Sequence, residues 1–198
     1  MDTTRLFLAA LGTAAVLGPA HAALIETTTG SAPGAAPVAT LDLPGAGVYS
    51  VDLSGLSSDA LQGDAANTVL RLTTDPTARV VGVGWDVSLM TDSPGVLSDA
   101  VIGLVDAAGD GLAINPGEGV SFPGTFSFAS APMIQPLGAM SFDSSGELFV
   151  ELYQLFSGPT AAYLDTSTLY IELEIVPAPG SAALLGLTGL LAARRRRR

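Results

Sequence analysis

Two stretches decide the fold class: residues 80–89, VVGVGWDVSL, and residues 168–175, TLYIELEI. Alternation of apolar with small or polar residues runs through both. A period of two with a polar outer face is typical of half-buried antiparallel strands. The core face of the first is predicted to carry Val81, Val83, Trp85, Val87 and Leu89, with Val80, Gly82, Gly84, Asp86 and Ser88 opposite; the second is predicted to bury Leu169, Ile171, Leu173 and Ile175.

Short strands of the same kind are expected along most of the chain. Candidates are 47–53, 68–73, 99–106, 119–128 and 146–156, separated by Gly, Pro, Asp and Ser. No long stretch has the 3.6-residue period of an amphipathic helix, and 59–66 would form a short helical turn at most. The sequence therefore predicts an all-β protein, a single antiparallel β-sandwich, of which a jelly roll is one arrangement. Residues 26–40, rich in Thr, Ala, Gly and Pro, predict a loose N-terminal lead.

The N-terminus has the layout of a secretory signal. Arg5 provides the positive charge, an apolar stretch covers residues 6–17, and Pro19 ends it. Ala20 and Ala22 are the small residues expected before a signal-peptidase site, so we expect cleavage between Ala22 and Ala23. The apolar stretch is shorter than the roughly 20 residues that a membrane span needs.

The C-terminus has three parts. Residues 176–180, VPAPG, end the last strand; residues 180–193 are apolar; and Arg194, Arg195, Arg196, Arg197 and Arg198 close the chain. A helix of fourteen residues is about 21 Å long, short of the roughly 30 Å hydrocarbon core. Positive-inside logic places the arginines in the cytoplasm and the preceding domain outside.

This arrangement resembles the PEP-CTERM sorting domain of exosortase substrates. The resemblance covers Val176 to Arg198, with Val176, Pro177, Ala178 and Pro179 as the sorting motif; Ala178 stands where the family usually has Glu. It implies export through the Sec translocon, transient anchoring in the inner membrane, cleavage by an exosortase, and delivery to the cell surface or extracellular matrix.

The expected organisation follows from these signals. It comprises a signal peptide (1–22), a loose lead (23–46), an acidic β-sandwich domain (47–175), and a sorting tail with a short membrane helix (176–198). Residues 23–175 hold two arginines and eighteen carboxylates, a net charge of −16. Such a domain repels nucleic acid and anionic lipid, which excludes a nucleic-acid-binding role.

Most catalytic chemistry is also excluded. The only histidine, His21, lies in the predicted signal peptide, and the chain has no cysteine and no lysine. Ser-His-Asp and Cys-His catalysis, the usual zinc sites and Schiff-base chemistry therefore have no residues to use. Two carboxylate pairs, Glu172 with Glu174 and Glu147 with Glu151, have the residue type of a glycosidase, but we interpret them as solvated strand faces. We predict no enzyme activity.

Two features point to binding. Asp106 and Asp110 fit two positions of a calcium loop, and Glu118 comes one residue late, so Asp106, Asp110 and Glu118 are the candidate calcium ligands. The alternative, which we favour, is an Asp-Gly turn between two strands. Trp85 could stack on a sugar, but its phase with neighbouring valines favours core packing.

The sequence as a whole predicts an exported structural or interaction protein of the cell surface or of a biofilm exopolysaccharide matrix. The alternative is a carbohydrate- or calcium-dependent binding module of the cell surface. Apart from that calcium, no cofactor is expected, and the expected partners are the Sec translocon, signal peptidase, an exosortase and extracellular polysaccharide.

Overall fold

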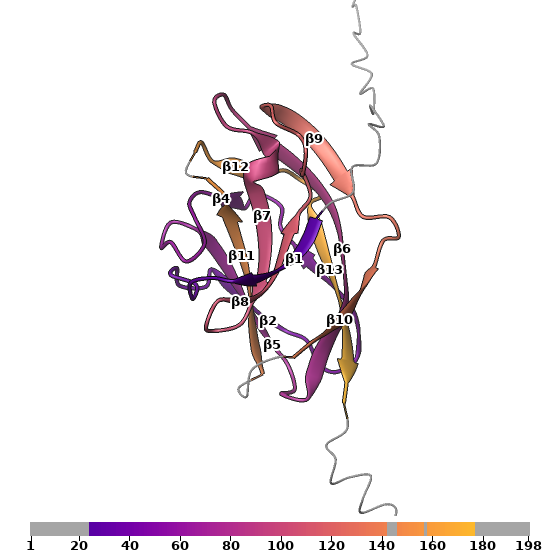
Figure 1. The fold of residues 1–198 in the computed structure, drawn as a ribbon. Helices are drawn as coiled ribbons and strands as arrows, with labels where there is room; N and C mark the ends of the chain where they lie inside the picture. Colours follow the sequence, from indigo (N-terminus) through magenta and orange to yellow (C-terminus); the bar gives the residue numbers. More distant parts are fainter. Residues whose placement is uncertain (1–23, 142–145, 157, 177–198) are drawn as a thin grey trace, which may run out of the picture.

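The chain folds into two β-sheets that face each other. The computed structural model describes residues 24–141, 146–156 and 158–176. Within these residues there are strands, turns and a short 3₁₀ segment, η1 (Leu97–Asp99), but no α-helix. Figure 1 shows the strands arranged in two layers. The prediction of an all-β sandwich is confirmed.

The first sheet has six strands. β11 (Glu147–Gln154) lies at its centre, and the pairs are antiparallel except that β2 (Ala39–Asp42) runs parallel to β5 (Thr68–Thr73). The prediction of a purely antiparallel sandwich is therefore wrong for this one pair. The strand order is β1 (Leu24–Thr29), β8 (Asp110–Asn115), β7 (Ala100–Val105), β11 (Glu147–Gln154), β5 (Thr68–Thr73) and β2 (Ala39–Asp42).

The second sheet is organised around one long strand, β6 (Ala78–Thr91). β9 (Gly124–Ala129) and β13 (Thr168–Ile175) both pair with Asp86, and β9 and β12 (Ala161–Tyr163) both pair with residues 89–91. β9 therefore lies on one edge of β6, and β12 and β13 lie on the other. The remaining members are β3 (Gly47–Asp52), β4 (Ser57–Ser58), β9 (Gly124–Ala129), β10 (Gln135–Ser141), β12 (Ala161–Tyr163) and β13 (Thr168–Ile175).

A β-bulge in β6 changes the face that was predicted for its first half. Glu172 of β13 lies opposite Gly82, but Leu173 lies opposite Val80, so Val81 is the extra residue. Val80 is fully buried in the core and Val81 is half-buried, which reverses the prediction for these two valines. From Val83 onward the alternation is as predicted. A bulge shifts the phase of a strand by one residue, and simple alternation cannot anticipate it.

The N-terminal lead is also more ordered than predicted. β1 and β2 lie within residues 23–46, which were expected to be loose. Ile25 and Leu41 pack against the core, and Leu43 is buried in it. Burial of these apolar side chains favours pairing of each short segment with a sheet edge, although the surrounding composition is typical of a linker. Residues 30–38 between them form no strand.

The core is built from the facing sides of the two sheets. Leu72, Ile102 and Leu152 come from the first sheet, and Val83 and Ile171 from the second; all five are fully buried. Burying a side chain of this size stabilises the fold by about 1.5–3 kcal/mol. All five further strand candidates contain or overlap a strand, whereas residues 59–66 form turns rather than a helical turn.

Candidate functional site

The two carboxylate pairs lie on the outer faces of β11 and β13. Glu147 and Glu151 share the outer face of β11 but are four residues apart, about 13 Å along a strand, which exceeds the roughly 5–9.5 Å between glycosidase carboxyls. Glu147 forms an ion pair with Arg71, and Glu151 is fully buried. Glu172 is half-buried and Glu174 exposed on the outer face of β13.

Asp106 and Asp110 form a hairpin turn between β7 and β8. One carboxyl oxygen of Asp106 accepts hydrogen bonds from the backbone N–H of Ala108 (2.8 Å) and of Asp110 (3.1 Å). Asp110 is the first of the six residues of β8, which is about 17 Å long, and Glu118 follows the far end of this strand. The structure therefore does not bring the three candidate calcium ligands together, and no group of three metal-binding side chains occurs among the described residues.

Trp85 lies in the core rather than on a binding surface. Its side chain is 3% exposed and belongs to the main hydrophobic cluster. Its backbone N–H donates to Ser130 Oγ at 3.0 Å, and its carbonyl accepts from the Ser130 N–H at 2.9 Å. A buried indole cannot stack on a sugar, so this residue gives the carbohydrate-binding alternative no support.

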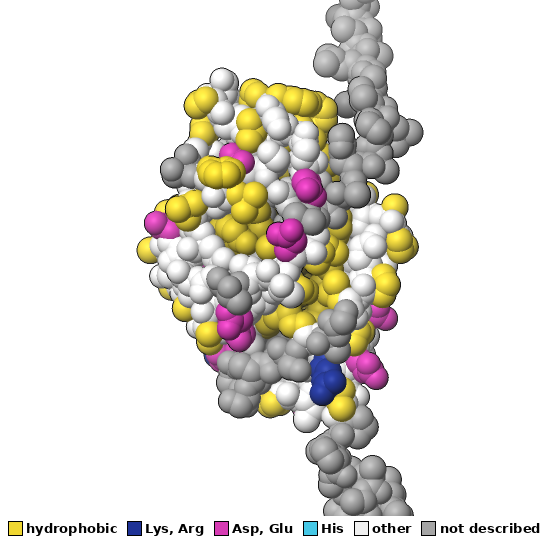
Figure 2. Space-filling view, viewed as in Figure 1, with side chains coloured by type: hydrophobic (Ala, Val, Ile, Leu, Met, Phe, Trp, Pro, Cys, Tyr) yellow, Lys and Arg dark blue, Asp and Glu magenta, His cyan; other side chains and the backbone are white. Residues whose placement is uncertain are grey.

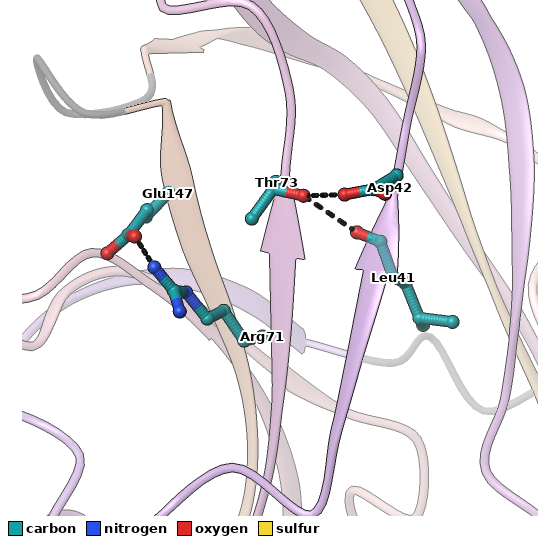
Figure 3. A network of polar contacts seen from close by, with 5 residues as sticks. All are labelled: Leu41, Asp42, Arg71, Thr73 and Glu147. Atoms are coloured by element: carbon teal, nitrogen blue, oxygen red, sulfur yellow. Dashed lines mark hydrogen bonds and ion pairs between the residues drawn. The ribbon is translucent and has the colours of Figure 1, made fainter.

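An open depression of about 510 Å³ lies where β2 and β5 end. Thr73 Oγ1 donates to Asp42 and contacts the Leu41 carbonyl, and Figure 3 shows these contacts beside the ion pair of Arg71 with Glu147. The Thr73 hydroxyl thus links β5 to its parallel neighbour β2. None of the described residues that line the depression is aromatic, and we interpret it as a polar clasp that holds β2 on the sheet.

Asp75 on the same depression is held by its own turn. Its carboxyl accepts from Thr77 Oγ1 at 2.6 Å and from the Thr77 N–H at 2.8 Å. These two hydrogen bonds, the hydroxyl first, lower the pKa of Asp75 below its usual range. A carboxylate already satisfied in this way is poorly suited to accept a proton from a substrate.

The most elaborate polar arrangement is buried under a loop. Glu151 accepts hydrogen bonds at one carboxyl oxygen from the backbone N–H of Gly63 and from Asn67 Nδ2, both at 2.8 Å. Asn67 in turn donates to the Leu61 carbonyl at 2.7 Å and accepts from the Ala60 N–H at 2.9 Å. This Glu151–Asn67 clasp fixes loop 59–67 on the outer face of the first sheet. Its burial makes it a structural element, so the prediction of a solvated Glu151 is wrong.

The predicted processing signals lie mostly outside the described residues. Ala20, Ala22, Ala23, Pro177, Ala178, Pro179 and the five terminal arginines belong to the undescribed ends, as does the apolar run 180–193. Val176 is described, and its N–H donates to the Thr77 carbonyl at 3.1 Å. In the part of the chain that the structure covers, no helix is long and apolar enough to cross a bilayer.

One surface feature was missed at the level of sequence. Residues 119–142 contain no Asp, Glu, Lys or Arg, although the chain carries a net charge of −11. They include β9 and β10, which line one edge of β6. Phe122 and Phe126 are 49% and 38% exposed there. The length of the uncharged run is the signal that could have identified this surface, which we call the uncharged edge.

Comparison with known proteins identifies no family for this chain. No protein-family model matches the chain, and no curated protein matches it. Among solved structures, similarity is found to the infectious bursal disease virus VP2 subviral particle (14% identity, 76% of this chain and 49% of that one, TM-score 0.19). The structure of the Gt strain of that virus is similar at 15% identity, over 77% and 50% of the two chains, with a TM-score of 0.21. The chain spans about half the length of these viral chains, and the likeness is too weak to indicate a function.

Proposed function

We propose that this chain is an exported, non-enzymatic structural or interaction protein of the bacterial cell surface or exopolysaccharide matrix. The observation that carries the proposal is how the fold fits between the two predicted processing sites. The first described residue, Leu24, already belongs to β1, and it is the second residue after the predicted cleavage between Ala22 and Ala23. The last strand ends at Ile175, directly before the sorting motif at 176–179. Processing at both ends would leave the sandwich whole.

The tail supplies the proposed route. A fourteen-residue apolar run is a weak membrane span that the five arginines would hold in place. A weak span suits a segment that anchors the chain only until an exosortase removes it. After removal the sandwich would be released outside the inner membrane.

The charge of the domain fits that destination. Its acidity keeps it soluble and repels other polyanions. Figure 2 shows acidic side chains scattered over one face of the molecule, around a central apolar region. The polar clusters of the described residues are structural clasps, which supports a scaffold role in preference to an active site.

The experiment that tests the proposal changes the motif and leaves the fold alone. Pro177 and Pro179 are replaced together by Ala, and the host cells are separated into membrane and extracellular fractions. The wild-type chain is expected outside the cell, and the variant is expected to accumulate in membranes. Pro37→Ala, at an exposed position of the N-terminal segment, is the control and should be exported normally. Equal extracellular amounts of variant and wild type would contradict the proposal.

A further inference from the structure

The strand edges that no described strand covers differ in charge. β1 carries Glu26, β2 carries Asp42, and β3 carries Asp52. β10 is interrupted by a register shift and by Pro136, and β4 has two residues. β9, with the sequence GTFSFA, has no charge, and among the described residues it pairs with β6 alone. Proteins usually protect a free edge with charges or proline, and β9 has neither within its length.

The register of β9 shows which backbone groups are free. The Ser130 N–H donates to the Trp85 carbonyl, and in an antiparallel ladder the hydrogen-bonded positions alternate. Phe126 and Phe128 therefore use their N–H and C=O groups toward β6. The N–H and C=O groups of Thr125, Ser127 and Ala129 point away from β6, to the free edge. They are the set that an added strand would need.

The side chains around this edge are apolar or small. Phe126 lies opposite the buried Leu89 and so projects from the inner face of the sheet, yet it is 38% exposed. Its ring meets that of Phe122 edge to face, with the centroids 5.3 Å apart. On the outer face, Ser127 Oγ shares a hydrogen bond of 2.7 Å with Ser88 Oγ. The nearest carboxylate on β6 is that of Asp86, opposite Ala129 at the end of β9.

We infer that β9 is a self-association edge, where a second copy of this chain adds its own β9 antiparallel about a two-fold axis. The outward backbone N–H and C=O groups of Thr125, Ser127 and Ala129 set the register of the two strands. Ser127 of one copy faces Ser127 of the other, and Thr125 faces Ala129. Phe126 then lies opposite Phe128 of the second copy, on the inner face. Aromatic pairs opposite each other across antiparallel strands are stabilising. The two seven-stranded sheets become one continuous sheet.

The distribution of charge favours a second copy of this chain as the partner at the edge of β9. A basic partner would be drawn to the many carboxylates elsewhere on the surface and not to an uncharged strand. Two copies of the chain, each with a net charge of −11, repel each other, and the uncharged edge lets them meet with few carboxylates in opposition. The association should therefore strengthen as salt is raised, because salt screens the remaining repulsion. The inference deepens the proposed structural role and rests on it for its use in the cell, but its test involves no sorting signal.

The absence of cysteine from the chain makes a direct test available. In the full chain, purified in mild detergent, Ser127→Cys places two thiols opposite each other on the proposed axis. Residues of a hydrogen-bonded antiparallel pair have Cα atoms about 5.5 Å apart, so a short thiol-reactive cross-linker can join the two sulfur atoms. Val48→Cys is the matched control, because Val48 is 56% exposed on β3, the edge strand at the other side of the same sheet. The cross-linker should give a covalent dimer of the first variant and leave the second as single chains.

Light scattering of the cysteine-free protein supplies the second measurement. The mass of the wild type should rise from one chain to two as protein and NaCl concentrations rise. Ser127→Pro removes an outward N–H without touching the ladder to β6, and Phe126→Glu adds a charge to the contact; both should stay single chains. Val48→Pro should associate as the wild type does. If Ser127→Pro does not fold, as judged by Trp85 fluorescence, Phe126→Glu decides.

Three results would overturn the inference. They are a wild type that stays a single chain at every salt concentration, a Ser127→Cys variant that cross-links no faster than Val48→Cys, and association that survives Phe126→Glu. None of these depends on where the protein is found in the cell, so failure here is distinguishable from failure of the proposed export route.

Discussion

Removal of the Glu151 side chain should destabilise the fold strongly, because this carboxylate holds a loop onto the first sheet. Glu151 is fully buried, and its one hydrogen-bonded oxygen satisfies two donors, the Gly63 N–H and Asn67 Nδ2. In Glu151→Ala the backbone donor loses its partner, and Asn67 Nδ2 keeps only its bond to the Leu61 carbonyl. Loop 59–67 would then lie on the sheet without its central attachment.

The magnitude follows from these contacts. Each buried donor left without a partner costs about 1–3 kcal/mol of stability. The variant no longer has to bury a carboxyl group, and the desolvation energy saved offsets part of this loss. We expect a loss of about 3 kcal/mol in the free energy of unfolding, which lowers Tm by roughly 6–12 °C in a domain of this size. Urea unfolding followed by Trp85 fluorescence measures the loss directly. Glu174→Ala, at an exposed position on β13, is the control and should change stability by less than about 0.5 kcal/mol. Equal effects of the two variants would refute the clasp.

Four further predictions use the same unfolding assay or simple spectroscopy. At the β6 bulge, Val80→Ala should cost about 2 kcal/mol and Val81→Ala less than about 1 kcal/mol, because only Val80 is fully buried; equal losses would contradict the bulge. Burial, with a smaller contribution from Glu151, raises the pKa of Tyr153 to about 12, and burial also raises the pKa of Tyr163. The unfolded chain loses these protons first, so stability should be complete below about pH 10 and should fall from there toward pH 12; stability that is flat over this range would count against the burial of both rings. Because the Tyr163 hydroxyl is buried without a hydrogen-bond partner among the described residues, Tyr163→Phe should unfold at the same or a higher urea concentration, and a large loss would reveal a missing partner. Trp85 should emit at short wavelength with no response to added oligosaccharides, and a shift on their addition would place it at a binding surface.

The fold class could be predicted because strand alternation is a local property. The strand at 168–175 alternates as its sequence indicates, with Leu169, Ile171 and Leu173 buried. The bulge at Val81 could not be predicted, since it depends on where Leu173 finds a partner across the sheet. A register shift depends on how two strands fit together, so the sequence of either strand alone does not reveal it.

The N-terminal strands and the buried Glu151 were missed for a related reason. β2 is four residues long and pairs parallel with β5, so its place depends on tertiary contacts and not on a hairpin turn. Glu151 sits on the outer face of its strand, where a carboxylate is usually solvated. Only the loop that carries Asn67, 84 residues away in the chain, turns this position into a buried one.

Of the candidate sites, the sequence pointed to the ends of the chain and left the uncharged edge unnoticed. Sorting signals are recognised by other proteins as linear segments, so residue order carries their information. The three candidate calcium ligands are not brought together because β8 separates Asp110 from Glu118, a distance that spacing in sequence conceals. The uncharged run 119–142 can be read from the sequence, but its role as an interaction surface depends on β9 lying at an edge of the sheet, which only the structure shows.

The most direct test of the proposed export route is intact mass spectrometry of the protein from its native host, applied to membranes and to the extracellular fraction. We expect an extracellular species that begins at Ala23 and ends within residues 176–179. That result would establish export and removal of the tail together. A species that still ends at Arg198 and occurs only in membranes would contradict the route, and the chain would then be a permanently anchored protein.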